Sequence, residues 1–211
     1  TQELIHDIAK AYQSFFKQIY AAGCRTVQLD DCTWGMIVDS DFWVSMAGKG
    51  FTLAHLALQY LSVNNLAIAG KPDGLVINTH VCRGNYHSCY ASKGAYDPVA
   101  PYLFAQENVN AYYLEYDDER SGSFEPLKYV SPDKKVVLGL ITTKSPVLED
   151  RNKIIDRIFE AEKYIPLDRL YLSPQCGFAS CEIGNKLTEE EQWAKIDLVT
   201  DIAAEVWGTT P

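Results

Sequence analysis

The sequence predicts an α/β fold made of parallel β/α units, and three observations support that prediction. Short apolar runs alternate with amphipathic helical segments along the chain, which is the pattern of strands joined by crossover helices. No proline- or serine-rich linker divides the chain, so we expect a single domain over residues 1–211. Residues with metal-binding side chains directly follow several of the apolar runs. Functional groups at the carboxyl ends of strands are typical of a (β/α)₈ TIM barrel, which is the architecture we predict.

The helical segments are predicted from apolar residues at helical spacing and from the residues that begin or end them. Gly23 and Gly70 follow the first two segments and are typical of helix C-termini. Thr188, with Glu191 three positions later, forms a capping-box pattern at the start of the last segment. The predicted helices span residues 3–22, 52–69, 98–107, 149–163 and 188–206.

The strands are predicted from the apolar runs between these helices. The run at 136–142 is almost continuously apolar, which is typical of a strand buried on both faces of a parallel sheet. A long connection rich in aromatic residues and glycine is expected over residues 32–51. A complete barrel has eight strands and usually about 250 residues, so the five strands found here predict either a barrel that lacks three strands or an open sheet. The predicted strands span residues 26–31, 75–79, 112–116, 136–142 and 170–173.

Composition argues against several classes of protein. The net charge is −9 and no basic stripe appears, so a nucleic-acid partner is not expected. No apolar run approaches about 18 residues, so we expect no membrane span. The first residues also lack a charged-then-apolar signal segment. The six cysteines are scattered and do not form a compact disulfide framework. We therefore predict a cytoplasmic protein with reduced thiols.

Four residues of the types that bind zinc each stand at the end of an apolar run: His80, Cys82, Glu115 and Cys176. Because the carboxyl ends of parallel strands share one rim of a barrel, these side chains are predicted to converge. Taken alone, a histidine is more often a core or loop residue, and a free cysteine is usually a small buried hydrophobe. A structural zinc module is disfavoured because paired Cys-x₂-Cys knuckles are absent from the sequence. The pattern therefore favours a catalytic zinc site.

Several longer stretches show a resemblance to a known family. They resemble the C-terminal catalytic domain of cobalamin-independent methionine synthase, and especially its shorter single-domain relatives. The matches run from about residue 20 to 206 in the family's order. The stretches are His-Val-Cys at 80–82, Tyr-Ile-Pro-Leu-Asp-Arg-Leu at 164–170, Ser-Pro-Gln-Cys-Gly-Phe at 173–178, Gln-Leu-Asp-Asp at 28–31 and Glu-Arg-Ser at 119–121.

The resemblance implies a fold and a reaction. In that family the domain is a (β/α)₈ barrel that moves a methyl group from a methylated folate to the thiol of homocysteine, and it holds Zn²⁺. By this comparison the present chain supplies strands four to eight of the barrel. We therefore expect either self-association or a missing N-terminal half-barrel, because an incomplete barrel exposes sheet edges. Two alternatives stay open: the same chemistry with a different methyl donor, and a zinc-binding fragment without turnover.

The resemblance also implies metal ligands, namely His80, Cys82, Cys176 and one carboxylate. Matching the Leu-Glu-aromatic segment selects Glu115 as that carboxylate, whereas counting back from the arginine of the Glu-Arg-Ser segment selects Asp117. The two acids are two residues apart and would face the same way if the strand continued. We favour Glu115 and leave Asp117 as the alternative.

Three further residues are implicated in the site by the resemblance. Asp30 matches the acid that holds the amino group of homocysteine, and Asp31 could share that role; the alternative for Asp30 is a turn or capping aspartate. Lys144 stands where the family has the histidine of a His-Ser-Pro segment that assists proton handling. A lysine normally stays protonated near neutral pH, so Lys144 would not shuttle protons in the same way. It could instead bind an anionic substrate group, which leaves the methyl donor open.

Overall fold

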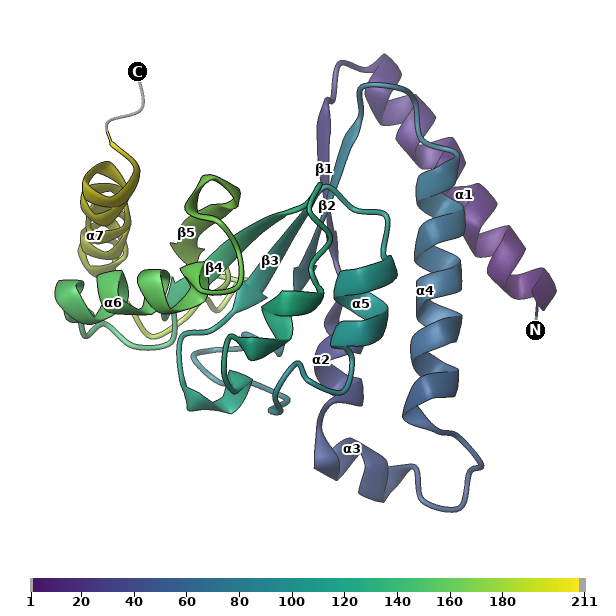
Figure 1. Ribbon diagram of the computed structural model, residues 1–211, viewed down its shortest axis with the longest axis horizontal. Coiled ribbons are helices and arrows are strands. Elements are labelled where there is room, and N and C mark those ends of the chain that lie inside the picture. Colours follow the sequence, from purple (N-terminus) through teal and green to yellow (C-terminus); the bar gives the residue numbers. More distant parts are fainter. Residues whose placement is uncertain (1, 209–211) are drawn as a thin grey trace.

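A computed structural model describes residues 2–208 and shows an α/β architecture around one parallel sheet (Figure 1). The sheet has five strands in the order β1-β2-β3-β4-β5, and every neighbouring pair is parallel. Strands that follow one another both in the chain and in space require a crossover after each strand, as predicted. The strands are β1 Thr26–Asp30, β2 Val76–Val81, β3 Ala111–Glu115, β4 Lys135–Ile141 and β5 Leu170–Pro174.

The long helices lie close to their predicted positions. Thr52 caps α4 through a hydrogen bond from the amide of His55, and Gly70 is its C-terminal cap. The capping box of Thr188 and Glu191 at the start of α7 is confirmed. The α-helices are α1 Gln2–Ala21, α2 Cys32–Ile37, α3 Ser40–Ser45, α4 Leu53–Ala69, α5 Ala100–Gln106, α6 Arg151–Glu162 and α7 Glu189–Trp207, with 3₁₀ turns at Glu119–Ser121, Glu125–Tyr129 and Leu167–Arg169.

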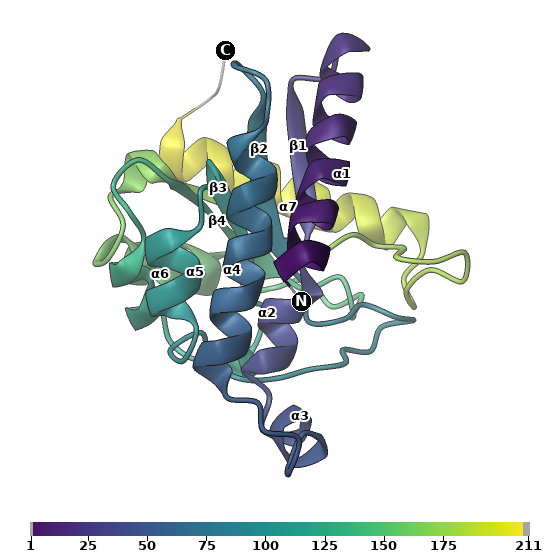
Figure 2. The same ribbon diagram turned by 90° about the vertical axis from the view of Figure 1, so that its right-hand side faces the viewer.

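The prediction of a long connection over residues 32–51 is wrong at Cys32–Ile37 and Ser40–Ser45, where α2 and α3 form (Figure 2). Each of these helices is preceded by an N-cap aspartate whose carboxylate accepts a hydrogen bond from the main chain. Asp31 accepts from the amide of Thr33 at 3.0 Å, and Asp39 accepts from the amide of Asp41 at 2.8 Å. Six residues are fewer than two helical turns, so these helices show no apolar periodicity that a sequence pattern could reveal.

The hydrophobic core lies between one face of the sheet and the helices. Alternate strand residues such as Ile77, Tyr112, Leu138 and Leu170 are fully buried on this face. Helices α1 and α4 run side by side next to β1, and α7 packs against β5 at the other edge (Figures 1 and 2). Within residues 2–208, no helix is both long enough and apolar enough to cross a membrane.

The opposite face of the sheet is left bare by the described residues. A hollow of about 570 Å³ lies along it, lined by residues of all five strands. Val76 and Tyr171 on this face are 37% and 38% exposed. Parallel sheets are normally covered on both faces. The described residues therefore form an open sheet with β1 and β5 at its edges and one uncovered face.

Candidate metal centre

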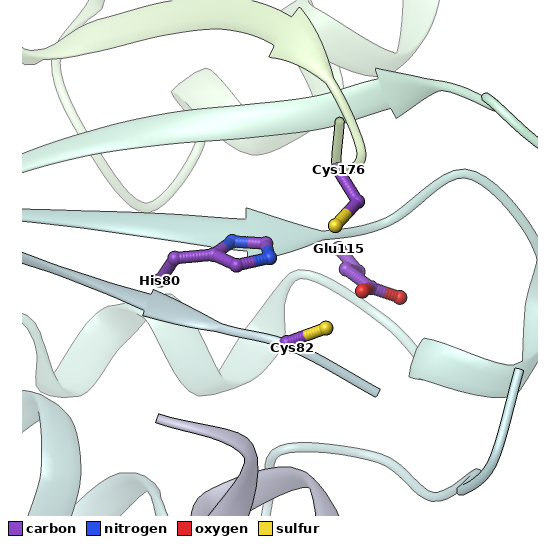
Figure 3. A group of neighbouring side chains, drawn as sticks. All are labelled: His80, Cys82, Glu115 and Cys176. Atoms are coloured by element: carbon purple, nitrogen blue, oxygen red, sulfur yellow. The ribbon is translucent and has the colours of Figure 1, made fainter. Parts of the chain in front are cut away.

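The four predicted metal-binding side chains meet at the carboxyl end of the sheet (Figure 3). One ligand atom from each of His80, Cys82, Glu115 and Cys176 lies within 4.8 Å of every other. His80 belongs to β2 and Cys82 follows that strand, whereas Glu115 ends β3 and Cys176 follows β5. Three strands thus contribute to one cluster, as the shared rim of a parallel sheet predicts.

Strand register explains why residues so distant in sequence converge. His80 pairs with Tyr113 in the β2–β3 ladder, and the next residues of both strands lead to Cys82 and Glu115. Strand β4 separates β3 from β5, but Gly139 stands in β4 at the level of the cluster. A Cβ atom at Gly139 would lie only 2.7 Å from the Cα atom of Gln175, the residue before Cys176. The missing side chain and the register shift after Gly139 let the Cys176 segment come close.

The imidazole of His80 is oriented by the main chain. Its Nδ1 atom lies 3.2 Å from the carbonyl oxygen of Tyr113, so Nδ1–H donates and the lone pair remains on Nε2. The Nε2 atom is buried and has no hydrogen-bond partner among residues 2–208. A buried, unpartnered imidazole nitrogen beside two thiols and a carboxylate fits a bound transition metal.

The two thiols are electrostatically linked. The amide of Gly84 donates to Sγ of Cys82 at 3.3 Å. A hydrogen bond from Cys82 lowers the pKa of Cys176 well below that of a free thiol, although burial opposes this shift. The same hydrogen bond, together with burial, raises the pKa of Cys82. The protein thus stabilises a negative charge on sulfur at this position, which is the form that binds a metal ion.

Glu115 is the carboxylate that the structure places in the cluster. It is fully buried; Oε1 accepts a hydrogen bond from the amide of Arg83 at 3.0 Å, and Oε2 accepts one from Nη2 of Arg120 at 2.8 Å. Asp117, the alternative, lies outside the cluster because β3 ends at Glu115 and the chain turns. Its Oδ1 atom instead lies 2.8 Å from Nη2 of Arg120. Arg120 therefore holds both acids, and only Glu115 faces the thiols.

Lys144 pairs with Asp117, the acid that lies outside the metal cluster. Its ammonium group is buried, 3.8 Å from Oδ2 of Asp117, and makes no hydrogen bond with the described residues. Lys144 also does not line the hollow next to the metal cluster. Its side chain thus extends a row of alternating charges that runs through Arg120 to Glu115.

The neighbouring acids of β1 have different surroundings. Asp30 is exposed, and it lines a hollow of about 260 Å³ together with His80 and Cys176. Asp31 points into the fold, where its Oδ1 caps α2 and its Oδ2 accepts from Nδ2 of Asn64 at 3.0 Å. Of the two predicted substrate-binding acids, Asp30 faces the hollow and Asp31 serves as a helix cap.

Two residues shape the site through long-range contacts that the sequence does not reveal. Arg83 contributes its amide to Glu115 and is itself 1% exposed. The side chain of Gln175 accepts hydrogen bonds at Oε1 from both the amide and the hydroxyl of Thr143. Both contacts join residues 32 positions apart, and no local pattern encodes such a distance.

Comparison with known proteins identifies the family. Residues 1–204 match the family model of the cobalamin-independent synthase, catalytic domain. The chain belongs to this family. The resemblance found in the sequence is thereby confirmed, as is the α/β fold with a parallel sheet of the TIM-barrel type.

Individual members of the family illustrate the match. The chain is 46% identical over 203 residues to the uncharacterized protein YxjG of Bacillus subtilis, covering 96% of the chain and 54% of that protein. It is 23% identical over 176 residues to a methionine synthase of Thermococcus kodakarensis, covering 83% of the chain and 44% of the relative. A crystal structure of a candidate vitamin-B12 independent methionine synthase from Listeria monocytogenes superposes with a TM-score of 0.77 at 42% identity, covering 99% of the chain and 56% of that structure. The chain spans about half the length of these relatives.

Proposed function

We propose that the chain is the zinc-binding part of a methyltransferase that moves a methyl group from a methylated folate to the thiol of homocysteine, which makes methionine. The observation that carries this proposal is the group of four ligand atoms within 4.8 Å at the carboxyl end of the sheet. Two thiols, one imidazole and one carboxylate form a donor set that suits zinc. The family supports a methyl transfer of the methionine synthase type.

Zinc, when bound, would lower the pKa of a substrate thiol and so supply a thiolate nucleophile at neutral pH. In the overall reaction a sulfur–carbon bond forms, the bond between the donor nitrogen and the methyl carbon breaks, and the departing nitrogen gains a proton. The similarity to a methionine synthase supports this reaction type.

Each residue of the site has a role in this proposal. His80, Cys82, Glu115 and Cys176 would hold the metal. If both thiols and Glu115 are ionised, the four ligands carry three negative charges, and Arg120 supplies a neighbouring positive charge at 2.8 Å from Glu115. Such a partner compensates burial of the carboxylate.

Asp30 would bind the amino group of the substrate, because its exposed carboxylate lies in the hollow that also contains His80 and Cys176. We give Asp31 a supporting role, since both of its oxygens already accept hydrogen bonds from the fold. Lys144 would act through charge, at one end of the row that includes Asp117 and Arg120.

A second candidate function is the same thiol methylation with a different methyl donor. Lys144 supports it, because its ammonium group is buried beside Asp117 and cannot take over the proton handling of a histidine while it stays charged. A donor whose leaving group needs no proton from this position would suit that arrangement.

We further propose that residues 1–211 are the C-terminal portion of a single TIM-barrel domain and supply its strands four to eight. The bare sheet face and its hollow of about 570 Å³ support this, because a parallel sheet needs a cover on both faces. A half-barrel of three further strands, or a second copy of the chain, would provide that cover. Sedimentation of the isolated chain tests this: a stable monomer with cooperative unfolding contradicts it.

Zinc analysis of matched cysteine variants tests the metal site. Cys176→Ser is expected to lose bound zinc, whereas Cys24→Ser keeps it, because Cys24 precedes β1 at the other end of the sheet. Equal zinc content in both variants would remove Cys176 from the site. Homocysteine methylation is then assayed with methylated folate, using the longer polypeptide where one exists. Zinc binding without methylation would support a different donor.

The remaining proposals concern the partners, the cellular location and the redox state of the thiols. We propose small-molecule substrates rather than nucleic acid, and a cytoplasmic location with reduced thiols. The net charge of −9 argues against a nucleic-acid partner, and the scattered spacing of the six cysteines supports reduced thiols.

A further inference from the structure

Two loops carry the cysteines of the metal cluster, and two asparagines join these loops. The first loop follows β2 and contains Cys82 and Asn85; the second follows β5 and contains Cys176 and Asn185. Nδ2 of Asn185 donates to Oδ1 of Asn85 at 2.8 Å, across a sequence separation of 100 residues. We call this pair, Asn85 with Asn185, the asparagine clasp.

Asn85 connects the backbone next to one thiol with the backbone next to the other. It lies three residues after Cys82 and is 5% exposed. Its Nδ2 atom donates to the carbonyl oxygen of Gly177 at 2.6 Å and to the hydroxyl of Ser180 at 3.2 Å. Gly177 directly follows Cys176, so movement of either loop strains a partly buried hydrogen bond within three residues of a ligand.

Asn185 extends the clasp to a third strand end. Its Nδ2 atom donates to the carbonyl oxygen of Thr143, beyond β4, at 2.8 Å. Its Oδ1 atom accepts a hydrogen bond from the amide of Ser88 at 2.9 Å. A further hydrogen bond, from the amide of Lys186 to the hydroxyl of Ser88, reinforces the contact at 2.8 Å. One amide side chain therefore ties together the loops after β2, β4 and β5.

Backbone strain lies where the two loops touch. His87 and Ser88 have positive φ values of 45° and 68°, in the left-handed region that side-chain-bearing residues rarely adopt. Such conformations are energetically unfavourable and persist only where surrounding contacts enforce them. The contacts present are those of Ser88 with Asn185 and Lys186, and that of Nδ1 of His87 with the carbonyl oxygen of Gly184 at 3.1 Å.

We infer that Asn85 and Asn185 are positioning residues that set the separation of the Cys82 and Cys176 sulfurs. Tetrahedral zinc with Zn–S bonds of about 2.3 Å needs its two sulfurs about 3.8 Å apart. A clasp that fixes both loops preorganises this separation before the metal binds. The inference rests on the proposed metal-binding role of the two thiols.

Asn185→Ala and Asn85→Ala test the clasp, with Zn²⁺ affinity measured by chelator competition on the 211-residue chain. Each variant is expected to bind Zn²⁺ about 10-fold more weakly, the lower end of the range for residues that orient metal ligands. The matched control is Asn65→Ala. Asn65 also bridges two segments, with Nδ2 2.9 Å from the carbonyl oxygen of Gln106 and Oδ1 2.8 Å from the amide of Asn108, before β3 and away from the cluster.

Co²⁺ substitution supplies a readout that a general loss of stability would not change. The clasp variants are expected to shift the ligand-field and thiolate charge-transfer bands of bound Co²⁺, whereas Asn65→Ala keeps the wild-type spectrum. The double variant Asn85→Ala/Asn185→Ala should lose less affinity than the sum of the two single losses, because the hydrogen bond between Asn85 and Asn185 is removed in both single variants. Far-UV circular dichroism shows which variants are folded.

The outcomes separate the two proposals. If Cys176→Ser abolishes Zn²⁺ binding but both clasp variants match Asn65→Ala in affinity and spectrum, the clasp inference is wrong and the metal site stands. Fully additive losses in the double variant would also overturn it. If Cys176→Ser binds Zn²⁺ like the wild type, the metal site itself is wrong.

Discussion

Two glutamates of this protein are completely buried, but their carboxylates have different contacts. Glu115 ends β3 and contacts the amide of Arg83 and the guanidinium of Arg120. Glu107 follows α5 near the amino end of the strands, and Oε1 accepts a hydrogen bond from Asn64 at 2.6 Å. Its Oε2 atom has no partner among the described residues. Only one of these acids has a positively charged contact.

The comparison shows that burial by itself does not make a metal ligand. Burial raises the pKa of Glu107 to about 8, although the hydrogen bond from Asn64 opposes the shift. Glu107 is therefore largely protonated at neutral pH, and a protonated carboxyl group is a poor ligand. Arg120 forms a salt bridge with Glu115, whereas the charge of Lys134 acts on Glu107 without a salt bridge among the described residues.

The largest expected effect comes from removing the charge of Arg120. Arg120→Gln leaves Glu115 and Asp117 buried without their shared partner, and should lower the free energy of unfolding of the metal-free chain by about 3 kcal/mol. Urea unfolding in the presence of a chelator measures it. The control is Lys10→Gln, whose pair with Asp7 is exposed and contributes less than about 0.5 kcal/mol. Equal losses of unfolding free energy in the two variants would show that Arg120 does not stabilise the two buried carboxylates.

Zinc affinity should separate the two glutamates directly. Glu115→Gln removes a proposed ligand and is expected to weaken zinc binding roughly 100-fold, a loss larger than that of a residue that only orients a ligand. Glu107→Gln is isosteric, lies outside the cluster and should leave zinc affinity unchanged. Chelator competition measures the zinc affinity of both variants. Weaker zinc binding by Glu107→Gln would contradict the proposed difference between the two glutamates.

The pH dependence of stability tests the neutral state of Glu107. Between its ordinary pKa of about 4.3 in an unfolded chain and about 8 in the folded chain, only the folded state holds the proton. This contribution to stability therefore falls as pH rises through that window and then levels off.

Glu107→Gln removes this titration, so its stability relative to wild type should increase between about pH 5 and about pH 8. Urea unfolding at several pH values measures the difference. Glu162→Gln, at an exposed position in the last turn of α6, is the control and should show a constant difference. A constant difference for Glu107→Gln as well would mean that Glu107 is ionised in the folded chain.

The smallest effect concerns the link between Glu107 and the end of β1. Nδ2 of Asn64 donates to both Asp31 and Glu107, and the charge of Asp31 contributes to the raised pKa of Glu107. Asp31→Asn keeps a capping oxygen but loses that charge and one hydrogen bond, so stability should fall by about 1 kcal/mol. The pH-dependent transition of Glu107 should also move to lower pH. If the transition stays at the same pH, the charge of Asp31 does not affect the pKa of Glu107.

Much of the fold follows from local patterns. Strand and helix positions are set by apolar spacing and by caps such as Thr188 with Glu191, and both are visible in a window of a few residues. Helices α2 and α3 were not predicted because each is only six residues long and follows an N-cap aspartate that also fits a turn.

The site was less completely predictable. The sequence favoured Glu115 but left Asp117 as an alternative, because residues two apart share one face only while a strand continues. The structure ends β3 at Glu115 and turns Asp117 toward Arg120. Asp30 and Asp31 are likewise adjacent, but only Asp31 reaches Asn64, a residue 33 positions away.

Local sequence was enough to predict a parallel β/α protein with zinc-type ligands at its strand ends, because strand alternation and capping depend on near neighbours. The three-dimensional packing selected the carboxylate that joins the thiols, left one sheet face bare and joined two loops through Asn85 and Asn185. These features depend on contacts between residues brought together by strand register. Such contacts join residues tens of positions apart in the chain, so no pattern among neighbouring residues predicts them.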